Sequence, residues 1–325
     1  MPFMKDIVVL GSTGSIGKQT LDVAAFQGYR VRAISACRSV RLAEEQIRRF
    51  HPVYCAMADE QAAKDLQTRV LDTDTKILSG NEGVCALPGL VECDAVVNAV
   101  VGRAGLLPTM ATLEAGRRLA LANKESLVCA GALVKRKALE KSCPVLPVDS
   151  EHSAVFQCLQ CGKKEEVSRI LLTASGGPFF GRTKEELSGV SAKDALAHPT
   201  WSMGAKITVD SATLMNKGFE VMEASYLFDV PADRIEVLVH RESVVHSMVE
   251  YCDSTVIAQL SLPDMRDCIQ YALTYPHRVK GPMSRLDLTK IGKLTFCPPD
   301  TRTFPLLSLA LWAMKEGGLA GAVLN

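Results

Sequence analysis

The sequence predicts an α/β fold in which a doubly wound, mostly parallel sheet is followed by an α+β region. Two observations support the first part. Short apolar runs alternate with helical patterns up to about residue 148, and a glycine-rich turn follows the first run. A third observation supports the second part: beyond residue 234, three β-rich runs follow one another with only short turns between them, which is typical of an antiparallel or mixed sheet.

In the first half, the apolar runs predict strands at 7–10, 30–36, 53–57, 95–99, 119–122 and 144–148. The first helices are expected at 15–27 and 39–50. In the second half, we expect strands at 170–173, 235–239, 244–250 and 255–261, and helices at 212–228 and 306–315. Residues 174–205 show little periodicity, and an irregular stretch of this length is usually a lid or a binding loop.

Composition limits the class of protein. The 325 residues suggest two or three domains, and 47% apolar residues suffice for a sizeable core. Because 37 basic residues balance 36 acidic ones, neither nucleic acid nor an anionic membrane is expected as the main partner. No apolar run reaches the roughly 20 residues of a membrane helix. Eleven cysteines without a secretory signal predict reduced thiols and a cytoplasmic location, and the single CxxC, at 158–161, does not predict a zinc site.

The glycine-rich turn at residues 11–17 (GSTGSIG) predicts a dinucleotide site. It stands between a strand and a helix, where glycines let the backbone approach a pyrophosphate at the helix N-terminus. The second strand runs into Cys37, Arg38 and Ser39 and lacks the acid that reads the NAD ribose. A basic group suits a 2′-phosphate, so NADP is favoured. The alternative for Arg38 is an ordinary solvated helix start.

Asp149 and Glu151 stand one residue apart where a strand meets a helix. Ligands bind outside the carboxyl ends of such strands, and carboxylates suit a hard cation such as Mg²⁺ or Mn²⁺. The alternative is that Asp149 caps the helix and Glu151 stabilises its first turn. Lys124 follows another strand and could contact a substrate oxygen, or could form a surface salt bridge at a helix start.

The helix expected from residue 212 carries a second polar group. Asn216, Glu220 and Glu223 share one face, and Lys217 precedes Glu220 by three residues. Ser211 is expected near the helix N-terminus, where anions are favoured. Because the rest of the helix is apolar, we expect this polar face to line a cleft.

Six motifs stand in one order along the chain: 11–17 (GSTGSIG), 122–126 (ANKES), 147–152 (PVDSEH), 173–178 (TASGGP), 198–204 (HPTWSMG) and 209–220 (VDSATLMNKGFE). In this order and spacing they resemble the 1-deoxy-D-xylulose 5-phosphate reductoisomerase family, and the resemblance runs from Met4 to Asn325. The resemblance implies rearrangement and NADPH reduction of this substrate to 2-C-methyl-D-erythritol 4-phosphate, in the non-mevalonate route to isoprenoids. It also implies Mg²⁺ or Mn²⁺, or Co²⁺ in their place, and a homodimer.

The resemblance implies four domain segments. They are a Rossmann-like NADPH-binding domain at 1–149, a catalytic domain at 150–274 with a flexible lid at 175–204 and a dimerisation sheet, a linker at 275–300, and the start of a C-terminal helical bundle at 301–325. The sequence ends at Asn325 within a run that continues in the family. Either the sequence is a fragment or the bundle is lost. A truncated first bundle helix would expose the apolar face of residues 306–312, and we expect impaired stability or solubility unless another segment covers that face.

The resemblance also implies residue roles. The metal ligands are Asp149, Glu151 and Glu220, which with Lys124 and His198 form the catalytic set. Substrate contacts are Lys124, Ser150, Glu151, Ser175, His198, Trp201, Ser211, Asn216, Lys217 and Glu220. Met203 belongs to the closing loop with His198 and Trp201. Cofactor contacts are Thr13, Gly14, Ser15, Ile16, Cys37, Arg38, Ser39, Asn123, Glu125, Gly204 and Met265. Cys37 departs from the glycine that is usual in the family.

Two other functions stay open at this point. A different NADPH-dependent oxidoreductase, acting on a semialdehyde or another sugar phosphate, would share the glycine turn but would not need the three carboxylates. A non-catalytic NADP-binding protein would bind the cofactor without turnover.

Overall fold

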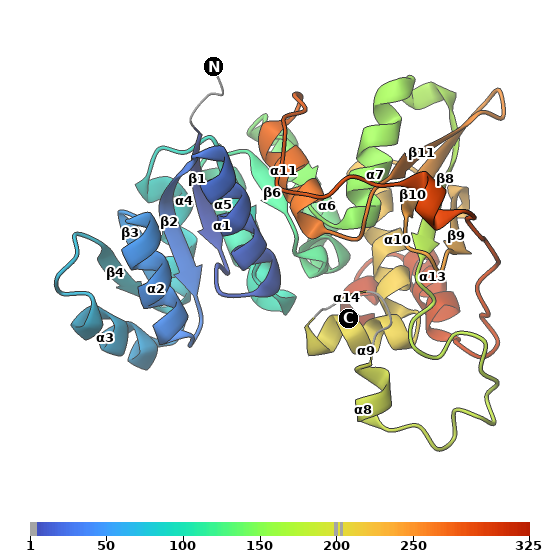
Figure 1. Ribbon diagram of the computed structural model, residues 1–325, viewed down its shortest axis with the longest axis horizontal. Coiled ribbons are helices and arrows are strands. Elements are labelled where there is room, and N and C mark those ends of the chain that lie inside the picture. The colour runs from blue at the N-terminus through green and yellow to red at the C-terminus, as the bar shows by residue number, and fades with distance from the viewer. Residues whose placement is uncertain (1–4, 198–200, 202–203) are drawn as a thin grey trace. The chain divides into compact units, whose positions relative to one another are not determined.

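The computed structural model describes residues 5–197, 201 and 204–325, which form two compact units (Figure 1). Unit one comprises the described part of 1–126 with 130–149 and 265–283, and unit two comprises 127–129, the described part of 150–264, and 284–325. None of the described helices is both long and apolar enough to cross a lipid bilayer. Each unit is built around a sheet of its own.

Seven parallel strands form the sheet of unit one, in the order β4-β3-β2-β1-β5-β6-β7. They are β1 (Asp6–Leu10), β2 (Arg30–Ala36), β3 (Tyr54–Met57), β4 (Lys76–Ser79), β5 (Ala95–Asn98), β6 (Leu119–Leu121) and β7 (Val145–Pro147). The predicted doubly wound sheet is confirmed. The strand order reverses between β1 and β5, which is where sheets of this kind bind ligands.

Helices cover both faces of this sheet (Figure 1). They are α1 (Ser15–Gln27), α2 (Val40–Phe50), α3 (Glu60–Arg69), α4 (Gly80–Leu90), α5 (Leu106–Glu114), α6 (Lys124–Glu140) and α11 (Met265–Thr274). On one face, Val8 and Leu10 of β1 pack with Val84 and Leu87 of α4. The predicted helix over 15–27 is α1, with the same bounds.

Unit two contains a mixed four-stranded sheet in the order β11-β10-β8-β9. Its strands are β8 (Val167–Ala174), β9 (Ile235–Val239), β10 (Val245–Tyr251) and β11 (Val256–Leu260). Strand β8 pairs in parallel with β9, and β10 runs antiparallel to both β8 and β11. The predicted mixed sheet is therefore confirmed, with β8 longer than the expected 170–173.

Two helices of unit two pack on one face of this sheet. Val155 of α7 (Ser150–Cys158) and Val221 of α10 (Met215–Phe228) join Ile170 and Val249 in one buried cluster. The other helices of unit two are α8 (Ala192–Ala195), α9 (Ala205–Ala212), α12 (Leu288–Ile291), α13 (Leu306–Glu316) and α14 (Ala320–Leu324).

Helix α13 approaches α10 closely. A Cβ added at Gly218 would lie 2.4 Å from the Cβ of Ala310, so the contact leaves no room for a side chain there. Leu307 and Ala310 of α13 are buried, whereas the side chain of Trp312 is 56% exposed. The expectation of an exposed face over 306–312 is therefore met only in part.

The helix predicted from residue 212 is wrong in its start. Two helices, α9 and α10, cover this stretch, and Leu214 between them has a left-handed backbone with φ of 62°. Ser211 consequently lies at the C-terminal end of α9 and not near a helix N-terminus. The sequence does not reveal the break between α9 and α10, because Leu214 is buried like the apolar residues of a continuous helix.

Candidate active site

In the turn between β1 and α1, backbone segments pack so closely that the glycines leave no room for side chains. Gly11 has a left-handed φ of 80°, and a Cβ there would lie 2.7 Å from the carbonyl oxygen of Ala99. A Cβ at Gly17 would lie 2.2 Å from the oxygen of Gly11. Thr13 and Gly14 belong to this turn, and Ser15 and Ile16 open α1. The helix N-terminus and its backbone amides could therefore hold the cofactor's pyrophosphate.

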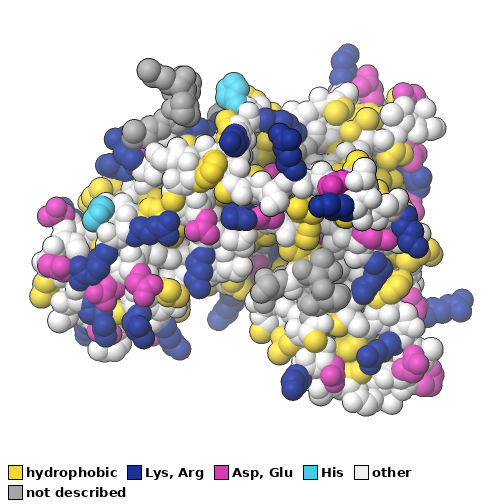
Figure 2. Space-filling model, viewed as in Figure 1, with side chains coloured by type: hydrophobic (Ala, Val, Ile, Leu, Met, Phe, Trp, Pro, Cys, Tyr) yellow, Lys and Arg dark blue, Asp and Glu magenta, His cyan; other side chains and the backbone are white. Residues whose placement is uncertain are grey.

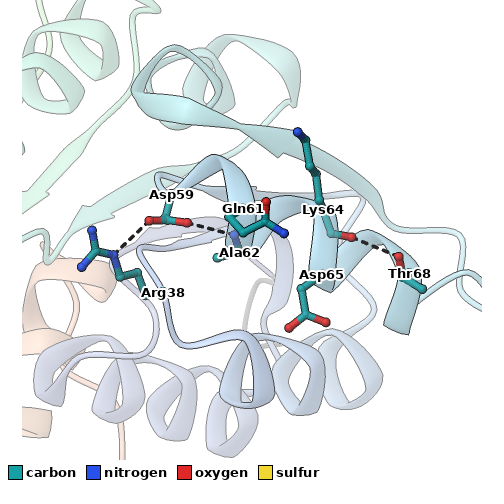
Figure 3. A pocket seen from close by; sticks show the side chains of 7 residues that line it. All are labelled: Arg38, Asp59, Gln61, Ala62, Lys64, Asp65 and Thr68. Carbon is teal, nitrogen blue, oxygen red and sulfur yellow. Dashed lines mark hydrogen bonds and ion pairs between the residues drawn. The ribbon is translucent and has the colours of Figure 1, made fainter.

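Arg38 follows β2 and borders an open pocket of about 570 Å³ (Figure 3). Its Nε lies 2.9 Å from Oδ2 of Asp59, while its side chain is 81% exposed. Asp59 also caps α3 by accepting from the backbone N of Ala62 at 2.9 Å. That hydrogen bond and the Arg38 guanidinium lower the pKa of Asp59. Cys37 is exposed beside this pair, and Ser39 precedes α2.

Asn123 is buried and holds the loop after β5 against the start of α6. Its side-chain amide donates to the carbonyl oxygens of Val100 and Gly102 at 2.8 and 2.9 Å, and its Oδ1 accepts from the backbone N of Ser126 at 3.0 Å. The same amide donates to Glu125 at 2.9 Å. This positioning role at the switch point of the sheet was not predicted.

Lys124 and Asp149 form a buried ion pair at the ends of the neighbouring strands β6 and β7. The Nζ of Lys124 lies 2.8 Å from Oδ2 of Asp149, and the side chains are only 9% and 12% exposed. A surface salt bridge, the alternative for Lys124, does not describe a pair that is this deeply buried. The pair instead places an ammonium donor beside a carboxylate that precedes α7.

Within unit two, Lys217 bridges two carboxylates. Its Nζ lies 2.8 Å from Oε1 of Glu151 and forms a short contact with Oε2 of Glu220. Burial alone would lower the pKa of Lys217, but Glu151 and Glu220 together raise it. Asn216 donates a short hydrogen bond to the other oxygen of Glu220. The ammonium therefore balances two carboxylates that would otherwise repel each other.

Asp149, Glu151 and Glu220 each offer one carboxylate oxygen, and these oxygens lie within 4.8 Å of one another. Three such oxygens fit Mg²⁺ or Mn²⁺, which prefer a few carboxylates together with oxygens from the substrate and water. Asp149 directly precedes α7 and Glu151 lies in its first turn. The capping alternative is thus compatible with a metal site and does not compete with it.

His152 and Glu223 are two further buried residues that were not assigned a role from the sequence. The Nε2 of His152 lies 2.9 Å from the carbonyl oxygen of Glu220, and its Nδ1 lies 3.5 Å from Oε2 of Glu223. His152 thereby ties α7 to α10 and fixes the separation of Glu151 and Glu220. The signal was present in the sequence, since His152 follows Glu151 and Glu223 shares the face of Glu220.

The loop after β8 meets the end of α9. A Cβ at Gly177 would lie 2.7 Å from the carbonyl oxygen of Ser211, so the segment that begins with Ser175 is in close contact with α9. The rings of Trp201 and His246 lie 6.1 Å apart, and burial lowers the pKa of His246 to about 4. Gly204 precedes α9 in unit two, and Met265 opens α11 in unit one. His198 and Met203 lie outside the described residues.

Comparison with known proteins decides the family. Three family models match successive parts of the chain. They are 1-deoxy-D-xylulose 5-phosphate reductoisomerase over residues 7–131, 1-deoxy-D-xylulose 5-phosphate reductoisomerase C-terminal domain over 145–228, and DXP reductoisomerase C-terminal domain over 260–325. The chain belongs to the 1-deoxy-D-xylulose 5-phosphate reductoisomerase family. Among reductoisomerases, that of Halothermothrix orenii is 53% identical over 99% of this chain and 84% of its own length. That of Acetivibrio thermocellus is 53% identical over 98% and 84%.

Solved reductoisomerase structures share the fold. The Zymomonas mobilis enzyme in complex with NADPH matches with a TM-score of 0.92 at 40% identity, over 98% of this chain and 83% of that one. A reductoisomerase in complex with NADPH, fosmidomycin and magnesium matches with a TM-score of 0.94 at 41% identity, over 99% and 82%.

Proposed function

We propose that this reductoisomerase-family chain converts 1-deoxy-D-xylulose 5-phosphate into 2-C-methyl-D-erythritol 4-phosphate, with NADPH and a divalent cation, in the non-mevalonate route to isoprenoids. The observation that carries the proposal is the convergence of Asp149, Glu151 and Glu220 in a chain whose family match spans nearly its whole length. Relatives solved with NADPH and magnesium support both cofactors.

The residues fit this chemistry. Asp149, Glu151 and Glu220 would hold a divalent cation, which would supply Lewis-acid polarisation of the substrate, and NADPH would supply the hydride. Lys124, held by its pair with Asp149, presents an ammonium donor for a substrate oxygen. Ser150, whose hydroxyl donates to Glu151 at 2.5 Å, is placed to reach the same substrate.

Contacts between the protein and the substrate's phosphate would hold the substrate in place for reaction at its other end. We assign Ser175, Ser211, Asn216 and Lys217 to the phosphate, so that binding energy away from the reacting carbons orients them. Lys217, whose Nζ pairs with Glu151 and Glu220, would have to turn toward the phosphate to make this contact. Trp201, with the loop that includes His198, would exclude water over the substrate.

NADPH is assigned to unit one. The turn of Thr13 to Ile16 would hold the pyrophosphate at the N-terminus of α1, and Arg38 would read the 2′-phosphate. Asn123 caps α6 and Glu125 lies in the first turn of that helix, which follows β6, the neighbour of β5. Cys37, Ser39 and Met265 complete the proposed cofactor contacts of unit one, and Gly204 is assigned to the cofactor by the family resemblance alone.

The test is NADPH oxidation with 1-deoxy-D-xylulose 5-phosphate, with and without Mg²⁺, with the product identified by NMR. We expect turnover that depends strictly on the metal, and at least about a hundredfold lower kcat for Glu220→Gln at saturating Mg²⁺. Glu316→Gln, on an exposed residue of α13, is the matched control. Turnover without metal would favour a different oxidoreductase, and NADPH binding without turnover would favour a non-catalytic protein.

We also propose a cytoplasmic homodimer. The eleven free cysteines support a reducing compartment. The sheet of unit two supports self-association, because β11 is an edge strand and its Val256 is 44% exposed. Light scattering coupled to size-exclusion chromatography would give the mass in solution, and a monomer at micromolar concentration would contradict the dimer.

A further inference from the structure

The loop that follows β8 has little intrinsic preference for one conformation. It begins Ser175-Gly176-Gly177, and the two glycines have left-handed φ values of 78° and 69°. Glycine reaches this region freely but also leaves it freely, since no side chain restricts its backbone. Contacts from elsewhere in the chain must therefore hold Ser175 in place.

Arg241 supplies such contacts. Its Nη1 donates to the carbonyl oxygen of Ser175 at 2.5 Å and to that of Gly177 at 2.8 Å. Its guanidinium carbon also lies 4.9 Å from the centroid of the Phe180 ring. One side chain thus contacts the loop at Ser175, Gly177 and Phe180. Hydrogen bonds from a charged donor are stronger than those from a neutral one.

Arg241 is itself presented by a well-fixed turn between β9 and β10. The backbone N of His240 donates to the carbonyl oxygen of Ala174 at 2.8 Å, which ties the turn to the end of β8. The Nε2 of His240 accepts from the backbone N of Val244 at 3.2 Å and of Val245 at 3.1 Å. Through Arg241, the loop that begins at Ser175 is therefore hydrogen-bonded to a turn that is itself held by the sheet.

We propose that Arg241 is a positioning residue for the substrate's phosphate, acting through the loop and not by direct contact. By holding the carbonyl of Gly177 it keeps that glycine against the end of α9, where a Cβ would already collide with the carbonyl oxygen of Ser211. The hydroxyls of Ser175 and Ser211 are thereby kept in one arrangement before the phosphate arrives. This inference rests on the proposed assignment of Ser175 and Ser211 to the phosphate.

The test compares Arg241→Met, Arg241→Lys and wild type. For Arg241→Met we expect KM for 1-deoxy-D-xylulose 5-phosphate to rise about tenfold, the effect of losing one charge-assisted hydrogen bond. We expect kcat to change less than about twofold, because the reacting end of the substrate is held by other residues. KM for NADPH should not change. Arg241→Lys keeps the charge but not the fork or the ring contact, so its KM should be intermediate.

Inorganic phosphate provides a second readout. Its inhibition constant should rise in Arg241→Met by the same ratio as KM, since both report the phosphate site. Arg234→Met, which changes an exposed arginine before β9, controls for the loss of a positive charge. Thermal unfolding midpoints identify any variant that fails to fold, in which case Arg241→Lys carries the comparison.

Three results would overturn the proposal: an unchanged KM, a raised KM with an unchanged phosphate inhibition constant, or an equal rise in KM for substrate and NADPH. If wild type does not turn over this substrate at all, the proposed function fails on its own. The positioning role is then still tested by thermal unfolding, because inorganic phosphate should raise the midpoint of wild type more than that of Arg241→Met.

Discussion

Replacing Lys217 by methionine should destabilise the protein in a way that a divalent cation repairs. The ammonium is 4% exposed and lies between Glu151 and Glu220, of which Glu220 is 2% exposed by side chain. Its removal leaves two adjacent carboxylates without their cation. Breaking a buried ion pair by deleting one partner typically costs about 3–5 kcal/mol. At roughly 2–3 °C per kcal/mol, the unfolding midpoint should fall by about 6–15 °C.

The assay is thermal unfolding of Lys217→Met and wild type, with EDTA and with millimolar Mg²⁺. Because Mg²⁺ would replace the missing positive charge, it should stabilise the variant more than it stabilises wild type. Lys206→Met is the matched control, since Lys206 pairs with Asp210 at the surface and such pairs contribute only about 0–1 kcal/mol. The carboxylates of Glu151 and Glu220 raise the pKa of Lys217 above the ordinary lysine value of 10.5. The stabilising effect of the ammonium is therefore fully present at neutral pH and is lost only when the pH rises above 10.5.

A loss of stability that is the same with Mg²⁺ and with EDTA would refute this reasoning, because the cation would then not share the carboxylates with Lys217. The reasoning would also be refuted if Lys217→Met were as stable as wild type in EDTA, since Glu151 and Glu220 would then need no positive charge between them.

Three further outcomes are expected. Arg38→Met should raise KM for NADPH about tenfold and leave KM for NADH unchanged, because only NADPH carries the 2′-phosphate; equal changes in both constants would contradict the assignment. Gly218→Ala should cost about 1–3 kcal/mol in urea unfolding, because the new methyl group meets Ala310 at 2.4 Å. His246 has its pKa lowered from 6.5 to about 4, so its contribution to stability should be lost as the pH falls through that range, by about 1.4 kcal/mol per pH unit. The difference in unfolding free energy between wild type and His246→Asn, measured from pH 7 to pH 4, checks this, and a difference that does not vary with pH would be the contrary result.

The sheet of unit one could be predicted because its central strands are buried on both faces and read as continuous apolar runs. Ile7, Val8, Val9 and Leu10 are all fully buried. Strand β4 was missed for the converse reason, since it lies at the edge and only Ile77 and Leu78 of its four residues are apolar.

The break between α9 and α10 could not be predicted. Leu214 adopts a left-handed backbone that leucine rarely takes, and tertiary packing around its buried side chain overrides its local preference. The spacing of apolar residues does not indicate the left-handed backbone at Leu214.

The candidate metal site required more than local spacing. Asp149 and Glu151 are neighbours, but Glu220 stands far along the chain, and its convergence with them was implied by the family resemblance and not by periodicity. The pairing of Lys217 with both Glu151 and Glu220 was not predicted, because the resemblance assigned this lysine to the phosphate. Contacts of this kind depend on how α7 and α10 pack, which the sequence pattern does not encode.

The return of the chain to unit one has a consequence for folding during synthesis. Helix α11 packs against α1, and Gln27 donates to Gln270 at 2.8 Å, although residues 150–264 of unit two separate α11 from the rest of unit one. At ordinary translation rates, on the order of ten seconds pass between the emergence of β7 and that of α11. During that interval the surface of α1 lacks its partner, so the first unit is not complete until most of the second has left the ribosome. The nascent chain should therefore depend on chaperones most strongly while it is between these two lengths.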